Sequence, residues 1–133
     1  MDLGYRTVMP VAWTVEPKGQ FVVLLPSDPS TIEEWRAAMI AILEAPISRP
    51  HLTMLVDRRT GETVSAEFVT HMARFFAEHK EALLHSRTAI VVSDDAAFGM
   101  GRMTELKSQL DNADSTIRVF RSYDAAVPWL TTR

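Results

Sequence analysis

Short apolar runs along this chain alternate with longer segments in which apolar residues recur every three or four positions. Two early runs, residues 8–15 and 21–25, are rich in β-branched and aromatic residues and flank a turn that contains Pro17 and Gly19. This pattern predicts an antiparallel hairpin, which residues 3–7 could extend. Three later apolar runs predict buried strands, at residues 52–56, 88–93 and 116–120.

The first two segments with helical spacing have clear start signals. Either Asp28 before Pro29, or a capping box of Ser30 and Glu33, is expected to begin the first helix. Pro46 should end the first helix, and Ser65 should cap the second. The residues expected on the inner side of the first helix are Ile32, Trp35, Ala38, Met39 and Ile42. Those expected on the inner side of the second are Phe68, Val69, Met72, Phe75, Phe76, His79 and Leu83.

Two more helices are predicted in the last third of the chain. Asp94 or Asp95 should cap the third helix, and Gly99 would let this helix approach the sheet closely. Its predicted inward row is Ala96, Gly99, Met103, Leu106 and Leu110. Ser122 should cap a short fourth helix, which Pro128 is expected to kink or end early because proline cannot donate a backbone hydrogen bond.

The order of these elements predicts an α/β fold. Helices that separate successive strands act as crossover connections, and such connections make the strands parallel. We therefore expect one domain, residues 1–133, built on a mixed sheet of five or six strands. An N-terminal antiparallel hairpin would come first and parallel strands would follow, flanked by four helices.

Composition narrows the function classes. With 14 basic and 17 acidic residues the formal net charge is -3, which offers no overall positive field for nucleic acid or an anionic membrane. The absence of cysteine excludes disulfides, thiolate nucleophiles and zinc–thiolate sites. The apolar runs are far shorter than the roughly 20 residues that cross a bilayer, and the first residues lack a signal-peptide pattern. These features favour a soluble cytoplasmic protein.

Several motifs in the second half of the chain suggest a family. Ala89-Ile90-Val91-Val92-Ser93-Asp94-Asp95 leads into Phe98-Gly99-Met100-x-Arg102-Met103, and Arg118-Val119-Phe120 precedes Ala125-Ala126-x-x-Trp129-Leu130. Together with the N-terminal hairpin and with Leu55-Val56-Asp57-x-Arg59 before a helix, this order resembles the SpoIIAA-like bacterial domains grouped with the STAS family. The likeness covers nearly the whole chain. It implies a mixed sheet flanked by helices and a domain that binds partners or small ligands without catalysing a reaction.

The resemblance also suggests a regulatory residue. In anti-sigma factor antagonists of this group, a phosphorylatable serine lies in an Asp-Ser-Ser-Gly type turn between a strand and the next helix. The matching turn here is Asp57-Arg58-Arg59-Thr60-Gly61, in which Thr60 is the nearest hydroxyl and hence the candidate for phosphorylation. The likeness of the group to lipid-binding CRAL-TRIO domains further implies an apolar ligand pocket. Pro128 departs from the uninterrupted final helix usual in such domains.

Charged and hydroxyl residues follow the predicted parallel strands, where ligands bind in open α/β sheets. The residues expected at this edge are Asp57, Arg58, Arg59, Thr60, Asp94, Asp95, Arg121 and Ser122. Arg58 and Arg59 could bind a phosphate or carboxylate near the start of the second helix. Alternatively, Asp94 and Asp95 only cap a helix and the arginines are solvated. The carboxylates of Asp57, Asp94 and Asp95 could also suggest a magnesium site. The favourable position of acidic residues at a helix start explains the aspartate pair more simply, and we expect no metal or cofactor.

Histidines and an outward aromatic residue raise further hypotheses. The histidines, which lack metal-ligand spacing and an accompanying hydrolase motif, are His51, His71, His79 and His85. His79 lies on the apolar side of the second helix, so it is expected to be a core histidine with a hydrogen-bond partner or an acid or base in a pocket. Phe98 points away from the predicted inward row. With Met100 and Ile40 it could form an apolar interface patch, or it could fold back over the first helical turn.

Three functional hypotheses are compatible with these patterns. The leading one is a non-enzymatic STAS-like regulatory or protein-binding module, with a protein partner or as a homodimer, that uses residues 57–61 and 93–100 as its contact surface. The alternative is a small-molecule or lipid carrier with a pocket between helices and sheet. That pocket would be lined by Met72, Phe76, Met100 and Met103. The third is a hydrolase-like enzyme that uses the strand-end acids and His79.

Overall fold

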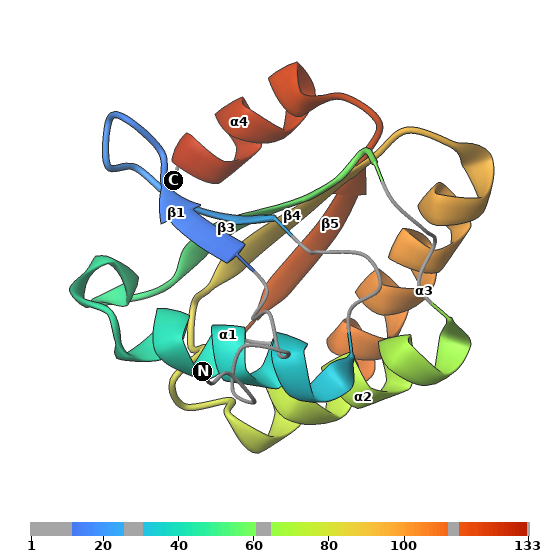
Figure 1. The fold of residues 1–133 in the computed structure, drawn as a ribbon, viewed down its shortest axis with the longest axis horizontal. Helices are drawn as coiled ribbons and strands as arrows, with labels where there is room; N and C mark the ends of the chain where they lie inside the picture. Colours follow the sequence, from blue (N-terminus) through green and yellow to red (C-terminus); the bar gives the residue numbers. More distant parts are fainter. Residues whose placement is uncertain (1–11, 26–30, 61–64, 112–114, 133) are drawn as a thin grey trace, which may run out of the picture.

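Five strands and four α-helices make up the part of the chain that the computed structural model describes, residues 12–25, 31–60, 65–111 and 115–132 (Figure 1). The strands are β1 (Ala12–Val15), β2 (Val22–Leu25), β3 (Thr53–Arg58), β4 (Arg87–Val92) and β5 (Thr116–Phe120). The helices are α1 (Ile32–Glu44), α2 (Ala66–Glu78), α3 (Asp95–Asp111) and α4 (Tyr123–Thr131), with a short 3₁₀ helix, η2 (Pro46–Ser48), after α1. This order confirms the predicted α/β class.

The strands form one mixed sheet whose spatial order follows chain order, β1-β2-β3-β4-β5. β1 and β2 are antiparallel, with Ala12 opposite Leu25, and the remaining neighbours pair in parallel. Gly19, in the turn between β1 and β2, has φ +71°, a conformation that glycine adopts without steric cost. The hairpin and the parallel strands are therefore confirmed. The strand residues predicted at 3–11 lie outside the described part.

Helices cover both faces of the sheet. α1 and α2 lie on one face, α4 lies on the other, and α3 lies beside β5 (Figure 1). Because side chains alternate along a strand, β3 supplies Met54 to the core under α1 and α2 and Leu55 to the core under α4. Buried residues of the second core are Phe21, Leu55, Ala89, Val91, Ala126 and Leu130. Among the described helices, none is both long and apolar enough to cross a bilayer.

The first helix begins at a different cap from those predicted. The Thr31 hydroxyl accepts the backbone N–H of Glu34 at 3.0 Å, and the Glu34 carboxylate accepts the N–H of Thr31 at 2.8 Å. The predicted caps, Asp28 or the Ser30 and Glu33 box, were therefore wrong, because starting at Thr31 lets both halves of the reciprocal pair form. Asp28 and Ser30 themselves lie outside the described part. Caps predicted correctly are Ser65 for α2, Asp94 for α3 and Ser122 for α4.

The inward face of α3 differs from the predicted row. Gly101 is buried against β5, where an added Cβ would stand 2.8 Å from the Cβ of Val119. Gly99 is exposed, and an added Cβ would meet no atom within 4 Å, so its assignment as the close-approach residue was wrong. Leu106 is 54% exposed and Ala96 is also exposed, so their assignment to the inward row was wrong as well.

The physical reason for this difference is that α3 packs against β5, the last strand of the described sheet, and contacts both the side chain and the backbone N–H of Val119. Glu105 is only 5% exposed, and its carboxylate accepts the backbone N–H of Val119 at 2.9 Å. The same carboxylate accepts a hydrogen bond from Arg102 at 2.6 Å. A helix in this place needs a small residue and a polar acceptor, and hydrophobic periodicity detects neither. Met103 is half-buried, and the Leu110 side chain lies outside the described part.

Pro128 lies within α4 and does not end it. The helix runs from Tyr123 to Thr131, and the Thr132 N–H donates to the Pro128 carbonyl at 3.0 Å. The expected early stop was therefore wrong. Pro128 is exposed in the second turn of the helix, so the fold loses only the hydrogen bond that its missing N–H would make to the carbonyl of Asp124.

Candidate partner-binding rim

The carboxyl ends of β3, β4 and β5 meet along one edge of the sheet, which we call the rim. The register places Asp57 opposite Val91 and Arg58 opposite Val92, so the two strands run in the same direction and end together. A hydrogen bond from the Ser93 hydroxyl to the Arg59 carbonyl, at 2.8 Å, joins the two segments just beyond the strands. The rim predicted from the strand pattern is therefore present, with residues 57–60 beside residues 93–95.

At the end of β3, Asp57 and Arg59 form a two-pronged ion pair. Arg59 Nε and Nη2 donate to the two carboxylate oxygens of Asp57 at 2.9 and 2.8 Å, and the Arg59 backbone N–H adds a bond of 3.2 Å. These hydrogen bonds from Arg59 lower the pKa of Asp57, against a smaller opposing effect of burial, and the Asp57 carboxylate raises the pKa of Arg59. Arg59 also lies over the Tyr123 ring at 5.1 Å. Much of its binding capacity is thus used within the protein.

The remaining residues of this turn differ in exposure. Arg58 is the last residue of β3 and is half-buried, whereas Thr60 follows the strand and is exposed. The two arginines predicted to bind an anion together are therefore not equivalent, because Arg59 is already paired with Asp57. Thr60 is open to modification on geometric grounds, as the candidate phosphorylation site would require.

At the start of α3, the two aspartates have different roles. Asp94 accepts the N–H of Ala97 at 2.8 Å, as a helix cap does. Asp95, whose side chain is 92% exposed, pairs with Arg121 at 2.7 Å. Arg121 in turn lies over the ring of Phe98 at 4.3 Å, so Phe98 is half-buried beneath a guanidinium. Within the described residues, no group of three or more histidine, aspartate or glutamate residues is placed to hold a metal ion.

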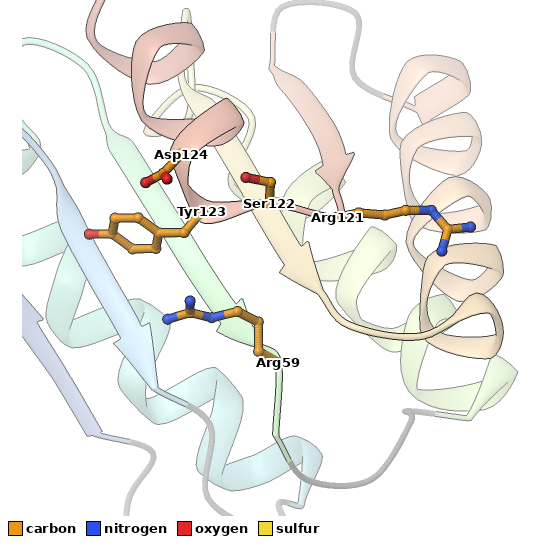
Figure 2. Close-up of a pocket in the computed structure, with 5 residues that line it drawn as sticks. All are labelled: Arg59, Arg121, Ser122, Tyr123 and Asp124. Atoms are coloured by element: carbon orange, nitrogen blue, oxygen red, sulfur yellow. The ribbon is translucent and has the colours of Figure 1, made fainter.

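A shallow cleft of about 400 Å³ opens at the rim, next to the first turn of α4. It is lined by Arg59, Arg121, Ser122, Tyr123 and Asp124 (Figure 2). Figure 2 shows the Arg59 guanidinium extended toward the Tyr123 ring, while Arg121 points away from it toward α3. Sequence reasoning missed Tyr123 and Asp124, although their position directly after the cap Ser122 places them at the rim.

The residues proposed for an apolar pocket lie elsewhere. Phe76 is 4% exposed and belongs to the core under α1 and α2, and Met72 packs against that core. Met100 and Met103 are half-buried on α3. Ile40, which the predicted interface patch grouped with Phe98 and Met100, is on α1. Phe98 and Met100 are on α3, and α2 packs against both of these helices.

His79 occupies the C-terminal cap of α2, where its geometry matches the core-histidine interpretation. Its Nδ1 lies 3.0 Å from the Phe75 carbonyl, to which it donates in the tautomer with hydrogen on Nδ1, and its ring stacks on the Phe75 ring at 4.0 Å. The side chain is half-buried. It lies at the other end of α2 from the turn that follows β3, so it does not join the strand-end acids.

The sequential mixed sheet, three crossover helices and a C-terminal helix on the opposite face define a SpoIIAA-like α/β domain. A solved structure with this arrangement is that of an uncharacterized protein of the DUF3478 family from Shewanella loihica PV-4, described as having a SpoIIAA-like fold. The alignment has a TM-score of 0.60 and 15% sequence identity, and covers 92% of this chain and 95% of that one. At this identity the likeness shows the fold. No family model matches the chain, and a search of curated proteins finds no match.

Proposed function

We propose that this chain is a non-enzymatic STAS-like regulatory module that binds a protein partner, or a second copy of itself, through the rim. The observation that carries the proposal is the cleft at the rim, where Arg59 and Arg121 stand on either side of the first turn of α4. Ligands of open α/β sheets collect at the carboxyl ends of the strands, which is where this cleft lies.

The geometry of the rim suits a protein better than a free anion. Arg59 and Arg121 are each held by a carboxylate and by an aromatic ring, so each presents a positive and a negative group side by side in a defined geometry. Fixed arginine and aromatic side chains lose little conformational entropy on binding and are enriched at protein interfaces. A partner with complementary charges would contact both the arginines and the exposed Asp95.

Thr60 would serve as the regulatory residue of such a module. It is exposed and follows the Asp57 and Arg59 pair in the chain. A phosphate on Thr60 would add a charge of about -2 in the neighbourhood of Asp57. That charge would compete with Asp57 for Arg59 and change the surface offered to the partner. Thr60→Glu should therefore alter partner binding more than Thr60→Gln, which has a similar size without the charge.

The experiment compares association of the wild type with that of Arg59→Ala and Phe98→Ala. Self-association is measured by size-exclusion chromatography with light scattering, and partner binding by affinity capture from the native source. Arg74→Ala, an exposed arginine on α2 remote from the strand ends, is the matched control. We expect both rim variants to weaken association by about tenfold and the control to behave as wild type. Unchanged association in both rim variants would defeat the proposal.

The carrier hypothesis has less support. Its proposed lining residue Phe76 packs in a ring cluster with Trp35 and Phe75, whereas the cleft at the rim is lined by polar and aromatic side chains. Native mass spectrometry of the purified protein addresses it directly. Lipid retained at one molecule per chain would favour the carrier over the module.

A further inference from the structure

On the side of the sheet where α4 lies, β5 is covered less by this helix than β3 and β4 are. α4 is nine residues long, or about 13 Å at 1.5 Å per residue, and it packs mainly on β3 and β4. Strands lie about 4.8 Å apart, so one short helix cannot shield every strand of the sheet. On β5, the side chains that alternate toward the α4 side are those of Thr116 and Arg118, which are exposed, and Phe120, which is half-buried.

Arg118, Phe120 and Trp129 form a cluster on this side of β5, which we call the β5 face. The guanidinium of Arg118 lies 5.4 Å from the centre of the Phe120 ring and 5.6 Å from that of Trp129, and the two rings are 5.6 Å apart. Arg87 supports the cluster: it lies 5.3 Å from the centre of the Trp129 ring and donates to the carbonyls of Trp129 and Thr132 at 2.7 Å each. Trp129 is therefore held in place at the C-terminal end of α4.

Arg118 differs from the other arginines stacked on aromatic rings in this half of the molecule. Those others each have an oxygen partner: Arg59 and Arg121 form ion pairs with Asp57 and Asp95, and Arg87 donates to the carbonyls of Trp129 and Thr132. Among the described residues, Arg118 has ring contacts and no carboxylate partner. An exposed, positioned guanidinium of this kind can take a carboxylate in a two-pronged hydrogen-bonded pair.

We propose that the β5 face is a second docking surface, which binds an acidic segment of a partner protein. An Asp or Glu of that segment would pair with Arg118, and adjacent apolar side chains would cover Phe120 and Trp129. Tryptophan and arginine are the residue types that most often dominate binding at protein interfaces. Charge complementarity selects an acidic partner. A nucleic acid fits less well, because the chain carries a net charge of -3 and the basic residues described on this face are Arg87 and Arg118.

This surface is separate from the cleft at the rim. Tyr123 lies in the first turn of α4 and Trp129 in the last, about 9 Å apart along the helix axis at 1.5 Å per residue. The proposal therefore does not depend on the function proposed for the rim, and variants at the two places distinguish them.

The test uses the full chain and a random peptide library displayed on phage. Peptides are selected on the wild type, synthesised and measured by fluorescence anisotropy, with Arg118→Ala, Arg118→Lys and Arg74→Ala as variants. We expect selected peptides to carry Asp or Glu beside apolar residues. Arg118→Ala should weaken their binding about tenfold or more, Arg118→Lys should weaken it less, and Arg74→Ala should leave it unchanged. Because Arg118 is exposed, the far-ultraviolet circular dichroism of each variant should match that of the wild type.

Four results would overturn the proposal. The selected peptides could lack acidic residues, or they could bind Arg118→Ala as tightly as the wild type. They could instead lose affinity in Arg59→Ala and not in Arg118→Ala, which would place them in the rim cleft. The last result combines two observations: no acidic peptide binds, and a single-stranded oligouridylate binds the wild type more tightly than it binds Arg118→Ala. This result would assign the β5 face to nucleic acid.

Discussion

Asp57 and Arg59 determine the chemistry of the rim at the scale of single residues. The pair neutralises two charges that would otherwise both face a ligand, and its two side-chain hydrogen bonds hold Arg59 over the Tyr123 ring. The sequence showed both residues at the end of a strand, but not that they would bind each other. Neighbouring charges two positions apart can pair or diverge, and the turn conformation after the strand decides which.

Replacing Asp57 with Asn should give a stability difference that depends on pH. The pKa of folded Asp57 lies below its ordinary value of 3.8 because of the hydrogen bonds from Arg59. The pair therefore contributes fully above that ordinary value, and its contribution is lost as the pH falls through the lower folded pKa. At neutral pH the free energy of unfolding of the wild type should exceed that of Asp57→Asn by less than about 1 kcal/mol, because the Arg59 side chain is 46% exposed.

Urea unfolding of both proteins across an acidic pH series measures this effect. The difference in free energy of unfolding should be constant from neutral pH to about pH 5 and should shrink below about pH 4. The control is Glu33→Gln, which removes an exposed carboxylate in the first turn of α1 and so reports the general effect of losing a negative charge. A difference that persists unchanged in strong acid would show that the Asp57 carboxylate is not the cause.

Among the secondary-structure elements, α3 shows most clearly what hydrophobic periodicity does and does not predict. Its existence and its start at Asp94 follow from local chemistry, since a carboxylate cap depends only on nearby backbone N–H groups. Its orientation does not, because the buried residues among the described side chains of α3 are Gly101, Thr104 and Glu105, which carry no apolar signal, and Gly101 and Glu105 contact Val119 of β5. Counting apolar residues instead favoured the side that contains Leu106, which is 54% exposed.

Two glycine substitutions in α3 test this orientation. Gly101→Ala should lower the free energy of unfolding by about 1–3 kcal/mol, because the new methyl group would overlap the Val119 side chain. Gly99→Ala should raise it by up to about 1 kcal/mol, because alanine favours a helix and its methyl group meets open space. Urea unfolding of the two variants measures both changes. The reverse order would show that Gly99 and not Gly101 faces the strand, and equal effects would show that the contact with Val119 does not distinguish the two positions.

Considered as a whole molecule, the chain places a core on each face of one sheet. The strand directions could be predicted, because the turn after β1 allows an antiparallel pair and the helices between later strands act as crossover connections, whereas the spatial order of the strands was not predicted. The cleft could be predicted only in part. Strand-end residues such as Arg59 follow from the pattern, and so does the position of Tyr123 directly after the cap Ser122, whereas the contact of the Arg59 guanidinium with the Tyr123 ring does not.

The two cores should unfold together, as expected of a single domain. Trp35 reports on the core under α1 and α2, and Trp129 packs against the core under α4. In a Trp13→Phe background, removing either of these tryptophans leaves one reporter. Fluorescence of each protein should give the same urea midpoint as its own far-ultraviolet circular dichroism. A Trp129 transition that precedes the loss of secondary structure would instead indicate two separately unfolding units.

The contact between Glu105 and Val119 has a consequence for assembly. A sheet that ends in an open strand can accept further strands from other molecules, which leads to domain exchange or fibres. Here the carboxylate already takes an N–H that an incoming strand would need, and α3 lies beside β5 along that side. Any molecule that approaches β5 must therefore come from above the pleated surface and bind through side chains, without lengthening the sheet.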